Sequence, residues 1–268
     1  DALAFFRMGD FYELFFADAE AAATALDIAL THRGEHAGQP IPMCGVPVAA
    51  AEAYLARLIR RGFRVAVAEQ MEAPAKGRPG KAPIRREVVR LVTPGTLTEE
   101  ALLEPGRANL LLALAPRQGR LGAAWLDVST GLFETESLPG AGLAALLGRL
   151  DPAEILAPTP LDLGEFTARR APERAPPASP AAFLAAGFGV ASLDALGSFS
   201  AEEVEAAALA LDYVRATQAG RQPRLGRPVP RGEAGHLAMD AATRASLEIL
   251  RTRDGGAAHT LAAAVDRT

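Results

Sequence analysis

The chain has 268 residues, which is enough for about two domains of ordinary size. Its formal net charge of -4 and its pI near 5.7 exclude a uniformly basic nucleic-acid-binding protein but leave room for a local basic patch. Cys44 is the one cysteine, so an intramolecular disulfide and a cysteine-based zinc site are excluded, and a reducing, cytoplasmic location is expected. No apolar run reaches the ~18 residues that a membrane-spanning helix needs, so we expect no membrane association.

Residues 1–103 have the pattern of a mixed α/β domain. Short apolar runs predict strands at residues 2–8, 64–68 and 87–92. Helical spacing of apolar residues extends over 14–26, and a second helix is expected over 47–61, with Gly62 ending it. The stretch 31–42 is rich in Gly, Pro and His, and we therefore expect it to be a loop.

A second domain is expected over residues 106–230. Apolar runs predict strands at residues 109–114, 120–128, 132–136 and 154–157. A helix is expected over 143–150, and an irregular, Pro-rich connection follows at 169–180. Ser200 and Glu203 have the three-residue spacing of a capping box, which predicts the start of a long helix.

The end of the chain contains a linker and the start of a third unit. Residues 219–235 are rich in Pro, Gly and Arg, which is typical of a linker. A strand–helix pair over 236–250 then begins a unit at residues 236–268 that we expect to continue beyond the chain. The predicted fold class is therefore α/β, with a mixed-sheet first domain followed by a second α/β domain.

Basic residues are concentrated in one part of this acidic chain. Residues 57–90 contain ten basic and three acidic side chains, a local excess of +7. The basic residues are Arg57, Arg60, Arg61, Arg64, Lys76, Arg78, Lys81, Arg85, Arg86 and Arg90. Such a patch can neutralise DNA phosphates, although a solvated face in an arginine-rich protein has the same composition.

Phe11 and Glu13 form a more specific pattern, directly after the Gly9–Asp10 turn. In an extended segment, residues i and i+2 point to the same side, whereas in a helix they lie about 200° apart. An exposed phenyl ring can wedge between base steps, and a carboxylate is tolerated beside DNA where it meets a base-edge donor. The alternative is that Phe11 fills the core and Glu13 is a first-turn acid of a helix.

Asp127 supports a different hypothesis, a metal-dependent nuclease of the ribonuclease-H type. It lies at the end of a predicted strand, before a hairpin turn at Ser129–Gly131. A two-metal site needs several converging acids, and Glu134, Glu136 and Glu154 are the candidates nearby in the sequence. The alternative is a structural aspartate that caps the turn.

Several segments, in order along the chain, carry a resemblance to a known family. In the first domain they are residues 5–15 (FFRMGDFYELF), 26–28, 30–34, 41–47 (IPMCGVP), 69–70 and 88–96 (VVRLVTPGT). Further on they are residues 126–131 (LDVSTG), 239–244 and 247–248. These segments resemble the mismatch-recognition domain, the connector domain and the entry to the core domain of the MutS family of DNA mismatch repair proteins.

The resemblance implies that the chain recognises mismatched or unpaired bases in double-stranded DNA. Phe11 matches the family's phenylalanine that stacks on the base from the minor groove of kinked DNA. Glu13 matches the glutamate that hydrogen-bonds that base. Arg33, Met43 and Arg86 match family positions near the DNA backbone or the minor groove.

The resemblance also implies domain roles and partners. Residues 1–103 correspond to the mismatch-recognition domain, 106–230 to a ribonuclease-H-like connector without that fold's catalysis, and 236–268 to the start of the helical core or lever domain. Full-length members form homodimers, bind MutL through the connector, and use ATP and Mg²⁺ in an ATPase domain. We therefore expect this segment to be a DNA-binding one, with no catalytic residue, metal or cofactor of its own. A further alternative is that 105–235 is a docking module for a repair partner.

Overall fold

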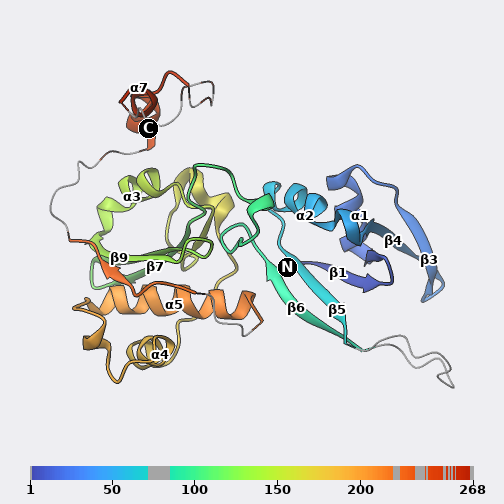
Figure 1. The fold of residues 1–268 in the computed structure, drawn as a ribbon, viewed down its shortest axis with the longest axis horizontal. Coiled ribbons are helices and arrows are strands. Elements are labelled where there is room, and N and C mark those ends of the chain that lie inside the picture. The colour runs from blue at the N-terminus through green and yellow to red at the C-terminus, as the bar shows by residue number, and fades with distance from the viewer. Residues whose placement is uncertain are drawn as a thin grey trace. The chain divides into compact units, whose positions relative to one another are not determined.

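The computed structural model describes residues 2–71, 85–219, 224–232, 239, 241–249, 252, 254, 256 and 258–265. The chain divides into two compact units, which are described separately (Figure 1). The first comprises residues 1–111, 127–132 and 211–226, and the second comprises residues 112–126, 133–210 and 227–268. Helices accompany a β-sheet of six strands and another of five strands, so the predicted α/β fold class is confirmed.

The six-stranded sheet lies in the first unit. In sheet order its strands are β3 (Thr31–His36), β4 (Gln39–Pro47), β2 (Phe11–Phe15), β1 (Leu3–Met8), β5 (Val65–Gln70) and β6 (Arg86–Val92). β1 pairs antiparallel with β2 and parallel with β5, so the sheet is mixed as predicted. The strands predicted at 2–8, 64–68 and 87–92 are confirmed. Each of these apolar runs satisfies its main-chain polar groups by pairing with a neighbouring strand.

Two predictions for the first unit are wrong. The expected loop at 31–42 contains β3 and the first four residues of β4, and the two strands form a hairpin with Gly38 at a φ of 76° in its turn. β3 is exposed along its whole length, so main-chain pairing forms this strand without the apolar alternation that sequence patterns detect. Leu14 and Phe15 belong to β2 and not to the following helix, because β2 pairs with β1 on one side and β4 on the other.

Helices α1 (Phe16–Leu26) and α2 (Ala51–Arg60) pack against this sheet and against each other. The fully buried side chains of the core formed there include Phe5, Leu14, Leu26, Leu58 and Val65. The helix predicted over 47–61 is confirmed in its main part, but Pro47 ends β4, because the 3-10 turn η1 (Val48–Ala50) precedes α2. Gly62 follows α2 with a φ of 81°, as expected of a glycine at a helix end.

The five-stranded sheet has the order β10-β7-β8-β9-β11. Its strands are β7 (Leu111–Arg117), β8 (Arg120–Asp127), β9 (Leu132–Pro139), β10 (Glu154–Leu156) and β11 (Val229–Pro230). The remaining helices are α3 (Leu143–Leu150), α4 (Pro180–Gly187), α5 (Ala201–Thr217), α6 (Ala241–Ser246) and α7 (Leu261–Val265). The remaining 3-10 turns are η2 (Glu100–Leu102), η3 (Gly140–Gly142), η4 (Gly164–Arg169) and η5 (Leu193–Ala195). Figure 1 shows α5 extending alongside the sheet strands.

Most elements predicted after residue 106 are confirmed, including the helix over 143–150 and the buried strand that follows it. The exception is the linker predicted over 219–235, which contains β11. This strand is exposed and short, and it forms by parallel pairing with β9, so no local pattern predicts it. Of the strand–helix pair expected over 236–250, α6 is the helix, whereas residues 236–238 lie outside the described residues.

The predicted capping box opens α5. The Ser200 amide donates to Glu203 Oε2 at 2.8 Å, and the Glu203 amide donates to Ser200 Oγ at 3.3 Å. Glu203 Oε1 also accepts a hydrogen bond from the Thr135 hydroxyl of β9 at 2.9 Å. One carboxylate thus satisfies a free amide at the helix start and connects α5 to the sheet.

Gly122 allows α5 to approach β8 closely. A Cβ placed on Gly122 would lie 2.1 Å from the Glu202 carbonyl oxygen, so even a methyl group requires the helix to shift. We expect Gly122→Ala to lower the free energy of unfolding by about 2 kcal/mol, measured by urea denaturation. Gly232→Ala is the matched control, because a Cβ there has no atom within 4 Å. Equal stability of the two variants would contradict this prediction.

Glu202 lies at the same helix start, and its contacts lead us to expect that the free energy of unfolding depends on pH in acid. Its carboxylate accepts a hydrogen bond from the Ser137 hydroxyl at 2.5 Å, which is the main cause that lowers the pKa of Glu202. A lowered folded pKa stabilises the fold above the unfolded value of 4.5, and this contribution is lost as the pH falls through the folded value. We expect the unfolding free energy of Glu202→Gln to depend less on pH below 4.5 than that of the unchanged protein, measured by urea titrations. The same pH dependence in both proteins would contradict this.

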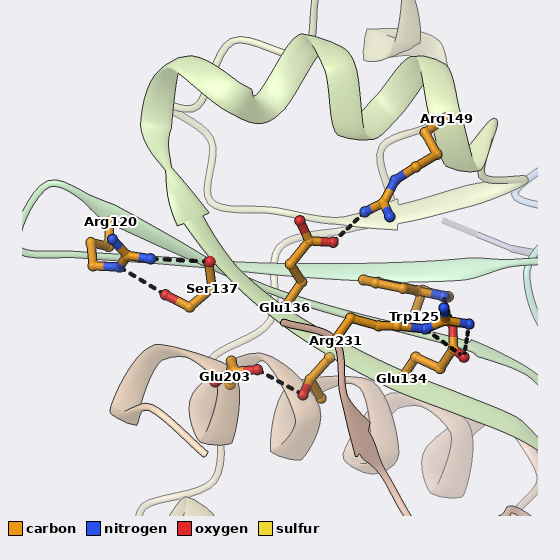
Figure 2. A network of polar contacts seen from close by, with 9 residues as sticks. Arg120, Trp125, Glu134, Glu136, Ser137, Arg149, Glu203 and Arg231 are labelled. Carbon is orange, nitrogen blue, oxygen red and sulfur yellow. Dashed lines mark hydrogen bonds and ion pairs between the residues drawn. The ribbon is translucent and has the colours of Figure 1, made fainter. Parts of the chain in front are cut away.

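Arg231 connects β11 to the sheet. Its guanidinium donates two hydrogen bonds to Glu134 Oε1, at 3.0 Å from Nε and 2.6 Å from Nη2. Glu134 Oε2 accepts a further bond from the Trp125 indole at 3.0 Å. Figure 2 shows this cluster beside Arg149, which pairs with Glu136 and lies 5.4 Å from the centre of the Trp125 ring. Charge-assisted bonds therefore hold a segment that composition alone marks as a linker.

Candidate nucleic-acid interface

Phe11 is exposed at the start of β2. It follows the Gly9–Asp10 turn, in which Gly9 has a φ of 62° that glycine adopts without strain. Phe11 is 47% exposed, and its Cδ1 atom would be 3.8 Å from a Cβ placed on Gly45 of the neighbouring strand. The ring lies beside a glycine and outside the core, so its surface is available for stacking.

Glu13 lies on the same face of the sheet as Phe11. β2 is a strand, and its alternate residues Tyr12 and Leu14 are buried in the core on the opposite face. The antiparallel register also places Phe6 of β1 opposite Glu13. Of the two conformations considered for this segment, the structure thus has the extended one, in which the Phe11 and Glu13 side chains point to the same side.

Glu13 forms an ion pair with Arg33. The Arg33 Nη1 atom, from the β3–β4 hairpin, donates to Glu13 Oε2. The Glu13 side chain is 14% exposed, and the Arg33 side chain is 55% exposed. The guanidinium therefore neutralises a carboxylate that would otherwise repel DNA phosphates, and it still presents open surface to solvent.

Apolar side chains surround this pair on the same sheet face. Met43, a predicted site residue, is paired with Phe15, two positions beyond Glu13. The Phe15 and Phe6 rings have centroids 6.2 Å apart, and neither side chain belongs to the buried core cluster. Three further side chains on this face were not indicated by the sequence. Phe15 lies there because alternate residues of β2 point to the same side, and the β1–β2 register places Phe6 opposite Glu13 and Met8 opposite Phe11.

Arg86, another predicted site residue, makes its contacts at the end of β1. Its Nε donates to the Arg7 carbonyl at 2.8 Å, and its Nη2 lies 2.8 Å from Met8 Sδ. The side chain is half-buried. Arg86 thus contacts the strand that leads into the Phe11 turn, a role that the sequence did not indicate.

Some side chains of the basic patch at residues 57–90 form hydrogen bonds and ion pairs within the protein. Arg57 donates to the Leu26 carbonyl, and Arg90 pairs with Glu99 while burial lowers the pKa of its guanidinium. Arg85 is 71% exposed and pairs with Glu87. Lys76, Arg78 and Lys81 lie outside the described residues. Among the described basic residues, Arg90 is therefore neutralised by Glu99, which lies outside the 57–90 stretch, whereas Glu87 is already subtracted in the excess of +7.

Asp127 caps the turn that follows β8. Its Oδ1 accepts hydrogen bonds from the Ser129 amide at 2.9 Å and from the Ser129 hydroxyl at 2.5 Å, and its Oδ2 accepts one from the Asn109 amide at 2.9 Å. The structural interpretation of Asp127 is thus confirmed. Within the described part of the chain, no three His, Cys, Asp or Glu side chains gather as metal ligands would, so the nuclease hypothesis gains no support.

Comparison with known families gives two matches, one after the other along the chain. The model of MutS domain I matches residues 1–101, and the model of MutS domain II matches residues 109–226. The chain belongs to the MutS family. The domain I match includes Phe11, Glu13, Arg33, Met43 and Arg86, and the domain II match includes the sheet from β7 to β10 together with α5.

Several bacterial relatives of this MutS chain carry the name DNA mismatch repair protein MutS. The protein of Granulibacter bethesdensis is 67% identical over 270 residues, covering 100% of this chain and 29% of the relative. The proteins of Paracoccus denitrificans and Ruegeria pomeroyi are 50% and 48% identical, with 31% and 32% of their lengths covered. The chain thus spans less than a third of the length of these relatives. Among the described residues, none of the helices has both the length and the apolar character needed to span a membrane.

Proposed function

We propose that this MutS chain recognises mismatched or unpaired bases in double-stranded DNA, with Phe11 stacking on the base and Glu13 hydrogen-bonding it. The observation that carries the proposal is the exposed Phe11 ring beside a half-buried Glu13 on a sheet face outside the buried core. The match to MutS domain I over the same residues supports it. The chain itself performs DNA binding and not an enzymatic step.

These two residues are suited to recognising how easily a DNA step deforms, and not to recognising a base sequence. A mismatched base pair is weakly stacked, so kinking and wedging there costs less than at a paired step. Phe11 is the first residue of β2 and is 47% exposed, so it can enter such a step with little loss of its own packing. Glu13 then accepts a hydrogen bond from the displaced base, which adds selectivity without a sequence code.

Arg33, Met43 and Arg86 supply the surroundings of these two residues. Arg33 is exposed enough to contact a backbone phosphate, whereas Met43 adds apolar surface beside Phe15 on the same face. Arg86 supports the end of β1 and adds positive charge. Phosphate contacts of this kind supply affinity that depends on salt and is independent of sequence.

Further roles follow from family membership and are proposals for the complete protein. Residues 1–103 are the mismatch-recognition domain, 106–230 the connector that binds MutL, and 236–268 the start of the core or lever domain. The complete protein is a cytoplasmic homodimer whose ATPase domain uses ATP and Mg²⁺. The domain II match supports the connector assignment. The relatives are much longer than this chain, which covers 29–32% of their lengths, and this supports further domains in the complete protein.

A direct binding comparison tests the proposal. The protein is titrated against a duplex with one G·T mismatch, a duplex with one unpaired T, and a matched duplex of the same sequence. Both defective duplexes are expected to bind more tightly at every salt concentration, since the deformation energy and not the phosphate charge differs among them. Equal affinity of the full protein for all three duplexes would contradict it.

A further inference from the structure

The pairing between β1 and β5 ends before either strand does. The parallel register runs from Leu3 with Val65 to Phe6 with Ala68, yet β1 continues to Met8 and β5 to Gln70. Beyond Phe6, side chains donate hydrogen bonds to the main chain of β1. Gln70 Nε2 donates to the Arg7 carbonyl at 3.1 Å, and Arg86 Nε donates to the same oxygen at 2.8 Å.

Glu69, the neighbour of Gln70 in β5, contacts β2, which forms a hairpin with β1. The Tyr12 hydroxyl donates to Glu69 Oε1. Tyr12 is 8% exposed, and its ring stacks on that of Phe5 with centroids 5.6 Å apart. Burial, followed by the Glu69 hydrogen bond, raises the pKa of Tyr12, so its hydroxyl keeps the proton that it donates. Tyr12 is the residue between Phe11 and Glu13.

We propose that Glu69 and Gln70 are positioning residues for mismatch recognition, because they fix the β1–β2 hairpin from β5 at the Tyr12 hydroxyl and the Arg7 carbonyl. This inference rests on the proposed function of Phe11 and Glu13. A ring that wedges into a base step must resist the push of the stacked bases, and a displacement of about 1 Å at a reacting or binding group can remove most of its effect. The Gly9–Asp10 turn is short and exposed, so the stiffness has to come from neighbouring strands.

Two variants remove one bond each without removing packing volume. Gln70→Leu deletes one of the two donors to the Arg7 carbonyl, and Tyr12→Phe deletes the hydroxyl that donates a hydrogen bond to Glu69. Each variant is expected to lower the ratio of mismatched to matched affinity by about fivefold, the size of one ordinary hydrogen bond. Affinity for matched DNA, which depends on phosphate contacts, should change by less than about twofold.

Glu87→Gln is the matched control. Glu87 is the cross-strand partner of Glu69 on β6, but it pairs with the exposed Arg85 and does not contact the hairpin through that ion pair. Its neutralisation should leave the ratio unchanged. Correct folding is checked by alkylation of Cys44, since the buried thiol, whose pKa burial raises to about 11, reacts only when this unit opens.

Amide hydrogen exchange supplies a readout that is independent of DNA. Residues 7–12 should exchange faster in Gln70→Leu and in Tyr12→Phe, whereas the amides of α1 should keep their protection. Unchanged exchange at 7–12, or an equal loss of affinity for matched and mismatched DNA, would overturn the positioning role. If both variants keep the ratio while Phe11→Ala loses it, the positioning role is wrong and the proposed function stands. If Phe11→Ala keeps the ratio, the proposed function is wrong and this inference is lost with it.

Discussion

Replacing Phe11 with alanine should abolish the preference for mismatched over matched duplex, lowering the ratio of the two affinities by roughly tenfold to a hundredfold. Stacking of a base on an aromatic side chain contributes about 1–3 kcal/mol, and Phe11→Ala removes the whole ring. The ring is 47% exposed, so its loss should change the unfolding free energy by less than about 1 kcal/mol. Fluorescence anisotropy with a G·T duplex and its matched counterpart measures the ratio.

Phe16→Ala is the matched control for this experiment. Phe16 is 51% exposed at the start of α1, with its ring centroid 6.0 Å from that of His36. Its removal deletes a phenyl ring of similar exposed fraction, and it should leave the ratio unchanged. A ratio that survives Phe11→Ala, or that falls equally in Phe16→Ala, would rule out a specific wedge at Phe11.

Reversing the charge of Arg33 (Arg33→Glu) should weaken binding to matched and mismatched duplexes alike, by roughly tenfold at low salt. The substitution replaces the ion pair with Glu13 by two adjacent carboxylates on the face that we propose binds DNA. Added salt screens this repulsion, so the deficit should shrink between about 50 and 200 mM salt. Affinities for both duplexes across this salt range measure the effect.

A charge swap separates neutralisation from base recognition. Glu13→Arg combined with Arg33→Glu restores an ion pair, so affinity for matched duplex should recover, but the carboxylate has left β2 and the mismatch preference should not return. Arg107→Glu is the control, because Arg107 pairs with Glu104 at 3.1 Å outside the domain I match. Unchanged binding by Arg33→Glu, or an equal loss in Arg107→Glu, would contradict the role of Arg33.

Local features could be predicted from the sequence because they depend on neighbouring residues. The apolar run of β1 and the helix α3 follow from side-chain periodicity over a few residues. The capping box at Ser200 follows from a three-residue spacing. The Phe11–Glu13 pattern identified the candidate site, and the family resemblance carried by residues 5–15 and 88–96 is confirmed by the MutS domain I match.

Tertiary pairing decided the conformation and the surroundings of that site. The polar segment of β3 becomes a strand only because β4 pairs with it, and this hairpin brings Arg33 to Glu13. Register alone brings Phe6 opposite Glu13.

The exposure of Phe11 and the contacts of Gln70 also depend on residues distant in the sequence. Phe11 lies beside Gly45 of β4, and Gln70 reaches the Arg7 carbonyl across 63 positions. A linear pattern records periodicity and caps, whereas contacts between distant segments depend on the free energy of the whole fold. The sequence by itself therefore determined the family and the candidate residues Phe11 and Glu13, and the tertiary structure decided which contacts hold these two residues in place.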